Sequence, residues 1–239
     1  MARPKGDIDQ RILHAARARF LAEGVDGASL RAVAKDARTS IGMIYYYFPT
    51  KDDLFFGVVE EVYQRVLRDI ETALAPDVDI EARIRRLYER IVRLDDDERD
   101  VLRLVVRESL TSAARRERLL ERFARGHFPI VIRTVLEGFA NGALDASLPP
   151  FVVATAIISL GALPPVAHRI AFGHLPLPGP KSPEDLPAEL VRALFSGIGA
   201  KAPTLPGSPR RTPARSPPKS GHSRAGIKGL RRKKTPGGA

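Results

Sequence analysis

Hydrophobic residues along the first 200 positions recur with the spacing of helices. Near the start, Ile12, Ala16 and Phe20 follow one another every four residues, and Leu13 lies beside them. This places them on one face of a helix, for which Gly24 is a suitable end. No stretch shows the alternation of β-branched and polar residues, bounded by tight turns, that is typical of strands. The pattern therefore predicts an all-α fold.

Two short helices and the start of a longer one are expected next. Ser29 is a candidate N-cap for a second helix, and a third is expected over about 40–48. Pro49 would end the third helix, because a helix rarely continues through proline. A fourth would begin at Thr50, where Asp53 stands at capping-box spacing. Three short helices leading into a long one are typical of a helix-turn-helix head.

The rest of the first 200 residues is also expected to be helical. The fourth helix should reach about Leu74, and we expect the later helices at about 80–94, 97–111, 114–125, 128–142, 150–172 and 184–198. The pair Pro164-Pro165 should kink or break the helix that contains it.

Charge is distributed unevenly along the chain. The net charge of the 239 residues is +11, and residues 201–239 hold eleven Lys and Arg but no Asp or Glu. The remaining 28 basic residues equal the 28 acidic ones, so the tail carries the whole excess. Its Pro, Gly, Ser, Arg and Lys cannot bury enough apolar surface to order it, which predicts a disordered tail. The tail could raise nonspecific DNA affinity or be an inert extension.

Composition narrows the function classes. Without cysteine the chain has no disulfide or thiolate nucleophile. No secretory signal is visible at the start, so we expect a cytoplasmic protein. The apolar run 151–167 is shorter than the ~20 residues of a membrane span, and no membrane partner is expected. The histidines lack paired metal spacing, and no nucleophile motif or phosphate loop is present. We expect neither an enzyme nor a cofactor or metal site.

The third helix is the candidate DNA reader. Ile44 and Phe48, four residues apart, can anchor it to a small core. Ser40, Gly42, Met43, Tyr45 and Tyr46 are then left on or near the outer face. A recognition helix presents such a face to base edges, while hydroxyl and basic groups beside it contact phosphates. The charge of Lys51, early in the fourth helix, would serve the latter purpose.

The stretch LRAVAKDARTSIGMIYYYFPTKDDL resembles the N-terminal domain of the TetR family of bacterial regulators. The resemblance covers about residues 8–58. It rests on residues that occur together in the family's order: Ile12, Ala15-Ala16, Phe20, Gly24, Ala34, Thr39-Ser40, Gly42, Ile44-Tyr45, Tyr47-Phe48-Pro49, Thr50-Lys51 and Asp53-Leu54.

The resemblance implies roles for individual residues. It places Ile41, Gly42, Met43 and Tyr45 nearest the bases, and it assigns phosphate contacts to Ser29, Thr39, Ser40, Tyr46, Tyr47 and Lys51. Arg38 stands where the family usually has glycine, so a positive φ there would be strained unless the turn differs. Arg38 could instead add a phosphate contact. Ile41 stands where a polar residue is common, which favours readout of thymine methyls and DNA shape.

The resemblance also implies an organisation for the whole chain. It divides the chain into a DNA-binding head (1–52), a helical effector-binding and dimerisation domain (53–200) and the basic tail (201–239). Dimerisation would use the last two helices, although their apolar stretches 151–158 and 190–198 would equally suit an intramolecular core. As effector-binding candidates we take polar or aromatic residues with apolar neighbours, each of which could instead be structural: Arg107, Glu108, Phe123, His127, Phe128 and His168.

The sequence thus predicts a homodimeric, sequence-specific regulator of double-stranded operator DNA. A small-molecule effector would release it from the operator, with repression favoured and activation left open. The alternative is an all-helical ligand-binding or interaction module whose basic tail contacts acidic partners.

Overall fold

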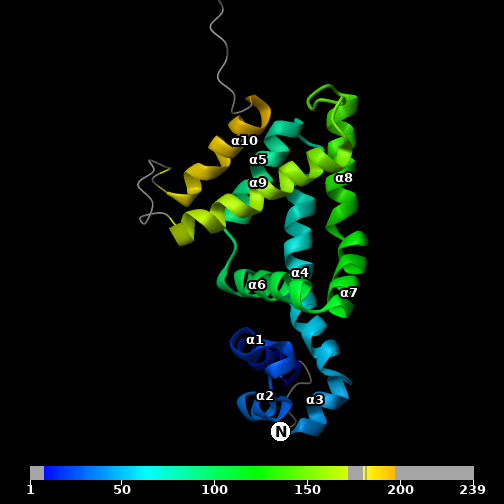
Figure 1. The fold of residues 1–239 in the computed structure, drawn as a ribbon, viewed down its shortest axis with the longest axis vertical. Coiled ribbons are helices and arrows are strands. Elements are labelled where there is room, and N and C mark those ends of the chain that lie inside the picture. Colours follow the sequence, from blue (N-terminus) through cyan, green and yellow to red (C-terminus); the bar gives the residue numbers. More distant parts are fainter. Residues whose placement is uncertain (1–7, 172–179, 181, 197–239) are drawn as a thin grey trace, which may run out of the picture. The chain divides into compact units, whose positions relative to one another are not determined.

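The computed structural model describes residues 8–171, 180 and 182–196, and the side chains of 166–171 are outside this description. Figure 1 shows an all-helical chain, as predicted, and the described residues contain no strand. The helices are α1 (Ile8–Gly27), α2 (Leu30–Asp36), α3 (Ile41–Tyr47), α4 (Lys51–Ala73), α5 (Ile80–Val92), α6 (Asp96–Thr111), α7 (Ala113–Ala124), α8 (His127–Ala140), α9 (Pro150–Ala171) and α10 (Leu186–Ser196). A short 3₁₀ turn, Pro183–Asp185, precedes α10.

Local capping explains where several helices begin. The hydroxyl of Ser40 accepts a hydrogen bond from the Met43 N–H and so caps α3. Thr50 and Asp53 form the reciprocal capping box expected at the start of α4. Polar side chains that satisfy the free N–H groups of a first turn typically stabilise a helix by ~1 kcal/mol. The boundary between α3 and α4 is therefore fixed by local chemistry.

One expectation about helix interruptions is confirmed and another needs correction. The backbone leaves the helical conformation at Gly24 (φ 80°, ψ 162°), where the first helix was expected to end, and a short helical turn beyond this kink continues α1 to Gly27. α9 runs through Pro164 and Pro165 to Ala171, so the predicted break does not occur. Each proline removes one helical N–H donor, but α9 packs against α5, α8 and α10, and this packing supports the helix.

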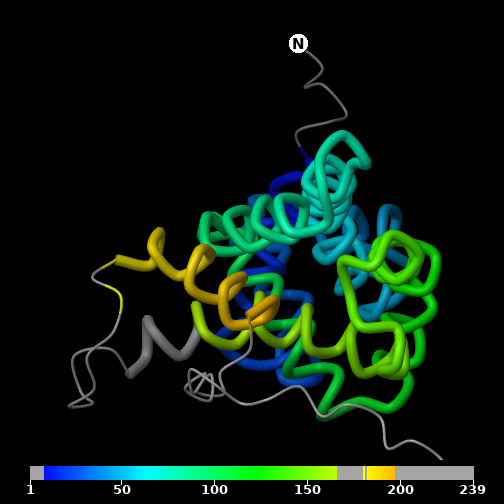
Figure 2. The backbone as a smooth tube through the Cα atoms, turned by 90° about the horizontal axis from the view of Figure 1, so that it is seen from above, coloured from blue at the N-terminus to red at the C-terminus, as the bar shows by residue number. Residues whose placement is uncertain are grey.

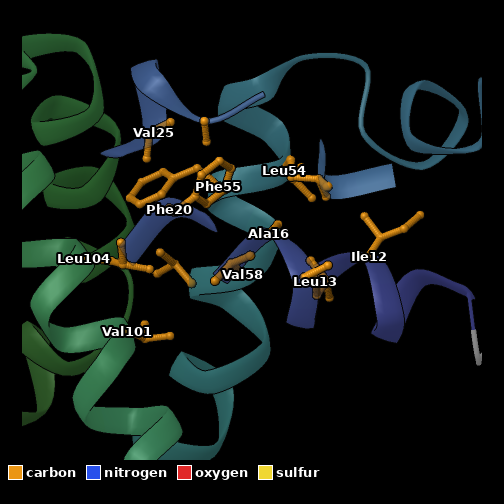
Figure 3. Packing of buried hydrophobic residues seen from close by; sticks show 14 of the residues in the cluster. Ile12, Leu13, Ala16, Phe20, Val25, Leu54, Phe55, Val58, Val101 and Leu104 are labelled. Atoms are coloured by element: carbon orange, nitrogen blue, oxygen red, sulfur yellow. The ribbon is translucent and has the colours of Figure 1, made fainter. Parts of the chain in front are cut away.

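The buried side chains form two clusters. The first joins the head to the middle of the chain, because Phe20 of α1 and Phe55 of α4 share it with Val101 and Leu104 of α6 (Figure 3). The second joins α5, α8, α9 and α10 around Tyr88, and Figure 2 shows α9 and α10 side by side there. α4 contributes to both clusters and carries the three head helices at one end (Figure 1).

The division of the chain at residues 52 and 200 stays a prediction. Its first boundary falls inside the first turn of α4. The predicted disordered tail, residues 201–239, lies outside the described residues.

Candidate nucleic-acid interface and effector cavity

The turn between α2 and α3 adopts the left-handed conformation in which glycine is usual. Arg38 has φ 52°. Its N–H donates to the Lys35 carbonyl at 3.1 Å, and the Thr39 N–H donates to the Ala34 carbonyl at 3.0 Å. This pair of bonds is the Schellman pattern that ends many helices. The strain anticipated at Arg38 is therefore present, and it costs roughly 1–2 kcal/mol in a residue with a Cβ.

α3 is held against the head by one face. Ile44 is fully buried, and Phe48 packs against α4 where Gly57 leaves room for it. A Cβ on Gly57 would lie 2.7 Å from Cε1 of Phe48, which is closer than side chains allow. The glycine therefore sets how closely the end of α3 approaches α4.

The opposite face of α3 is open to solvent. Tyr46 is 70% exposed and Tyr45 is 50% exposed, and both are accompanied by exposed Ile41 and Gly42. Met43 is half-buried. This face has no charged residue, so it offers phenol hydroxyls, a bare backbone at Gly42 and apolar groups to a partner.

The candidate phosphate-binding residues surround this face in different environments. Ser29 is exposed at the start of α2 and makes no capping hydrogen bond. Tyr47 is half-buried between the rings of Tyr46 and Phe48, at centroid distances of 5.2 and 6.4 Å. The ammonium of Lys51 donates to the Asp26 carbonyl at 2.9 Å.

Arg38 is exposed and Thr39 is half-buried, and the Ser40 hydroxyl accepts the capping hydrogen bond while keeping its own proton to donate. The candidate residues 29, 38–43, 45–47 and 51 thus lie at the start of α2, in the turn between α2 and α3, on α3 and at the start of α4, and their contacts with DNA stay a prediction.

A buried arginine joins α7 to the head. Nε of Arg115 donates to Asp52 at 2.9 Å, and its Nη1 donates to Glu108 at 2.6 Å and to Asp26 at 3.2 Å. The Arg115 side chain is 7% exposed and that of Glu108 is 4% exposed. Hydrogen bonding to Asp26 above all raises the pKa of Arg115 above its ordinary value, and the same contact lowers the pKa of Asp26. Carboxylates from α1, α4 and α6 therefore meet at one cation.

Two neighbouring arginines reinforce this contact. Arg107 of α6 donates to the carbonyls of Phe20 and Leu21 near the end of α1, the latter at 3.1 Å. Arg118 of α7 lies 4.0 Å from the centre of the Phe56 ring and pairs with Asp53 at 3.4 Å. We name the group Arg107, Glu108, Arg115 and Arg118, with its partners on α1 and α4, the head contact.

A cavity of about 210 Å³ lies between α4 and the helices around it. Side chains from α4, α5, α6, α7, α8 and α9 line it, and all but three are apolar. The polar ones are Tyr63, Glu98 and His127. The wall from α6 is formed by Val101, Leu102 and Val105 beyond Glu98, so α6 contacts the cavity along one stretch and the head along the next.

Tyr63 and His127 form a pair at the cavity wall. The Tyr63 hydroxyl lies 2.9 Å from Nδ1 of His127, and the backbone N–H of His127 donates to the same hydroxyl oxygen at 3.2 Å. Burial lowers the pKa of His127 to about 4, so the imidazole is neutral at physiological pH. Burial likewise raises the pKa of Tyr63 above its ordinary value.

Glu98 is an ionised but fully partnered group. It accepts hydrogen bonds from Arg90 at 2.5 Å, from Arg65 at 3.3 Å and from the Asp95 N–H at 3.0 Å. Burial alone would raise the pKa of Glu98, but these partners, Arg90 first, bring it below its ordinary value. The carboxylate is therefore already neutralised within the fold.

The structure separates the effector-binding candidates. Phe123 and His127 line the cavity, and the ring of Phe128 meets that of His127 edge-on, with the ring centres 4.8 Å apart. Arg107 and Glu108 belong to the head contact instead. His168 lies in α9 with its side chain outside the described residues. The sequence reading did not single out Tyr63, because its pairing with a residue 64 positions away leaves no trace in the local pattern.

The surface of α9 carries unburied apolar side chains. Phe151 is 78% exposed, Val152 48%, Ile158 42% and Leu163 65%. Singly exposed apolar residues are ordinary, but several along one helix mark a candidate contact surface. Within the described part of the chain, no helix is long and apolar enough to cross a membrane, and no cluster of His, Asp and Glu suits a metal ion.

Comparison with known proteins agrees with the geometry of the head. Residues 12–58 match the family model of bacterial regulatory proteins of the tetR family. The nicotine-responsive transcriptional repressor HdnoR of Paenarthrobacter nicotinovorans is 28% identical over 97 residues, which are 40% of this chain. The matched part spans only half the length of that repressor.

Solved structures share the fold at low sequence identity. FadR of Bacillus subtilis, solved with stearoyl-CoA, has a TM-score of 0.63 and 18% identity, covering 80% of this chain and 99% of its own. FadR of Bacillus halodurans, a fatty acid degradation regulator, has a TM-score of 0.61 and 18% identity, covering 82% of this chain and 98% of its own. The likeness therefore extends over the helical part of the chain, beyond the head.

Proposed function

With its helix-turn-helix head this chain belongs to the TetR family of DNA-binding transcriptional regulators, and we propose that it is a repressor released from its operator by a small molecule. The observation that carries the proposal is the course of α6 and α7. Both helices line the cavity, and both supply side chains to the head contact. A ligand between α4, α6 and α7 is therefore placed to change the position of the head.

In the proposed complex α3 enters the major groove. Ile41, Gly42, Met43 and Tyr45 meet the bases, with the apolar side chains contacting thymine methyls. The surrounding phosphates are contacted by Ser29, Arg38, Thr39, Ser40, Tyr46, Tyr47 and Lys51. The ammonium of Lys51 gives one hydrogen bond to Asp26 and keeps further protons for a phosphate oxygen.

We propose that the protein acts as a homodimer. Two heads would reach successive major grooves of a near-palindromic operator, about 34–36 Å apart. The exposed apolar side chains of α9 are the proposed contact between subunits. This places the effector cavity between the dimer contact and the DNA.

Release requires a ligand that binds better to the arrangement unable to hold the operator. HdnoR is named as responsive to nicotine, and the Bacillus subtilis FadR structure holds stearoyl-CoA, so related folds take up small molecules. In this chain a shift of α6 would carry Arg107 and Glu108 with it. Their bonds to α1 and to Arg115 would then change the angle of the head.

The alternative is an interaction module in which the head is structural and the tail contacts acidic partners. No described feature of the cavity favours it, whereas the exposed face of α3 argues against it. Deleting residues 201–239 separates the two. A regulator keeps its sequence preference and loses only salt-dependent nonspecific affinity, but a tail-driven binder loses all nucleic-acid affinity.

The decisive experiment is selection from random duplex DNA with the full chain, followed by sequencing of the bound pool. An enriched two-fold symmetric motif supports the proposal. Tyr45→Ala should then abolish recovery of that motif, while the exposed Arg116→Ala serves as a matched surface control. A folded protein that enriches no motif at modest salt would contradict the proposed function.

A further inference from the structure

We propose that the cavity takes a neutral hydrocarbon-like molecule, which it holds by apolar contacts alone and selects by size. The inference rests on the proposed function in taking this cavity as the effector site, and it adds the chemical class of the ligand. Three observations carry it: the apolar surface of the wall, the hydrogen bonds that already satisfy the polar side chains around it, and the volume of the cavity.

The wall of the cavity presents almost only carbon to a ligand. Valine, leucine and isoleucine side chains form most of it, and the ring of Phe123 and the methyl group of Ala162 complete it. The three polar lining residues add almost no polar surface. A cavity lined by aliphatic and aromatic side chains stays dry and takes up apolar molecules such as benzene. The wall therefore favours a ligand without polar groups.

The polar side chains at the wall are already bonded within the protein. The Tyr63 hydroxyl lies within hydrogen-bond distance of Nδ1 and of the backbone nitrogen of His127. The Glu98 carboxylate accepts hydrogen bonds from Arg90 and Arg65. Among the described residues, no buried side-chain nitrogen or oxygen lacks a hydrogen-bond partner. A polar group on the ligand would therefore lose its bonds to water and gain none in return, which weakens binding.

The volume of the cavity limits the size of the ligand. A cavity of ~150 Å³ with apolar walls holds one benzene molecule. By that comparison, the 210 Å³ here suits a molecule of about eight to ten non-hydrogen atoms. Because no polar group fixes the ligand in place, volume and shape are what distinguish one hydrocarbon from another.

The first test compares four probes of similar size and different polarity, by calorimetry on the full-length protein without DNA at pH 7.5. The probes are butylbenzene, propiophenone, 3-phenylpropanoate and 3-phenylpropylamine. We expect butylbenzene to bind most tightly. The ketone should bind about tenfold more weakly, because its carbonyl oxygen is buried without a donor. The carboxylate and the amine should bind at least about a hundredfold more weakly, because each would bury an unpaired charge.

The second test varies the length of the hydrocarbon at constant chemistry. From toluene to butylbenzene, the affinity should rise about fourfold with each added methylene, as expected for the burial of apolar surface. At hexylbenzene the affinity should stop rising, because the chain exceeds the volume of the cavity.

Variants then place the ligand in this cavity. Ala162→Leu adds three carbons at the wall, so it should weaken butylbenzene binding at least about tenfold and move the size limit toward toluene. Val105→Leu fills the cavity from α6 and provides a second route if the first variant does not fold. Ala114→Leu, at an exposed position of α7, makes the same change as Ala162→Leu away from the cavity and should leave the affinity unchanged.

The outcomes are distinct. A ketone or charged probe that binds as tightly as butylbenzene, failure of every hydrocarbon to bind, or an unchanged butylbenzene affinity in both cavity variants would overturn the ligand class. An affinity that keeps rising to hexylbenzene would overturn the selection by size. A hydrocarbon that binds as expected but does not release the selected operator would leave the class intact and contradict the proposed release mechanism. Failure to enrich any operator contradicts the DNA-binding proposal without touching this one.

Discussion

Helices α6 and α7 contact the rest of the chain in two ways that differ in kind. At the cavity they present Val101, Val105 and Phe123, whose contacts are non-directional and follow buried area. At the head contact they present Arg115 and Glu108, whose bonds require particular atoms within about 3 Å. The apolar wall of the cavity can therefore adapt to a bound molecule. The hydrogen bonds of the head contact weaken when the helices shift.

The difference explains how a small apolar ligand could act at a distance. An apolar wall can admit a molecule by modest displacement of its helices, since no hydrogen bond there has to break. The same displacement at Arg115 would lengthen bonds to three carboxylates from three different helices. Because these partners lie on α1, α4 and α6, the bonds of Arg115 fix the orientation of the head relative to α6 and α7.

Breaking the charged contact should have the largest effect. Arg115→Met removes the closer of the two cations that pair with Glu108, whose side chain is 4% exposed, and leaves only Arg107 at 3.2 Å. Loss of one member of a buried pair typically destabilises by about 3–5 kcal/mol. Urea unfolding of the Arg115→Met variant measures this loss of stability, and Arg116→Met, at an exposed position, is the control.

A second variant tests the reason for that loss. Glu108→Gln combined with Arg115→Met removes the buried charge that has lost its closest partner and should recover part of the stability. If Arg115→Met costs no more than Arg116→Met, the head contact does not have the energetic role assigned to it here.

The next effect concerns the polar pair at the cavity and depends on pH. His127 has its pKa lowered by burial to about 4 in the folded chain, against about 6.5 in an unfolded one. Between these values the unfolded state binds the additional proton, so the folded state loses stability as pH falls from about 6.5 to 4. The full loss is about 3 kcal/mol.

Unfolding of the wild-type protein and of His127→Phe across this range measures the dependence. The wild type should lose stability relative to the variant as the pH falls, because phenylalanine does not titrate. Parallel curves for the two proteins would show that His127 is not kept neutral by the fold.

The sequence predicted the two regions unequally. The positions of α3 and α4 could be predicted from the sequence because local chemistry fixes them: Ser40 and Thr50 cap the helices, and Pro49 separates them. The residues that line the cavity could be predicted only in part. Phe123 and His127 stood out as aromatic groups with apolar neighbours, but Tyr63 joins His127 across 64 positions through tertiary packing alone.

The same reason explains the placement of Arg107 and Glu108. A polar pair with apolar neighbours on a helix is compatible with a ligand site or with an internal ion pair, and only the position of Arg115 and of the end of α1 decides which partners they meet. The continuation of α9 through Pro164-Pro165 also depends on the neighbouring helices. Local rules thus succeed where a cap or a turn sets the structure and fail where packing does.

The smallest expected effect on stability comes from a strained backbone position. It involves neither the apolar cavity nor the charged head contact. Arg38 adopts φ 52° at the end of α2 and its side chain is exposed. Arg38→Ala keeps the strain, whereas Arg38→Gly relieves it, and the glycine variant should be the more stable by about 1 kcal/mol. Both variants lose the guanidinium, so they should bind the operator equally weakly if Arg38 contacts a phosphate. Thermal unfolding and operator titration of the pair thus separate the two roles, and a glycine variant no more stable than the alanine variant would show that the turn is not strained.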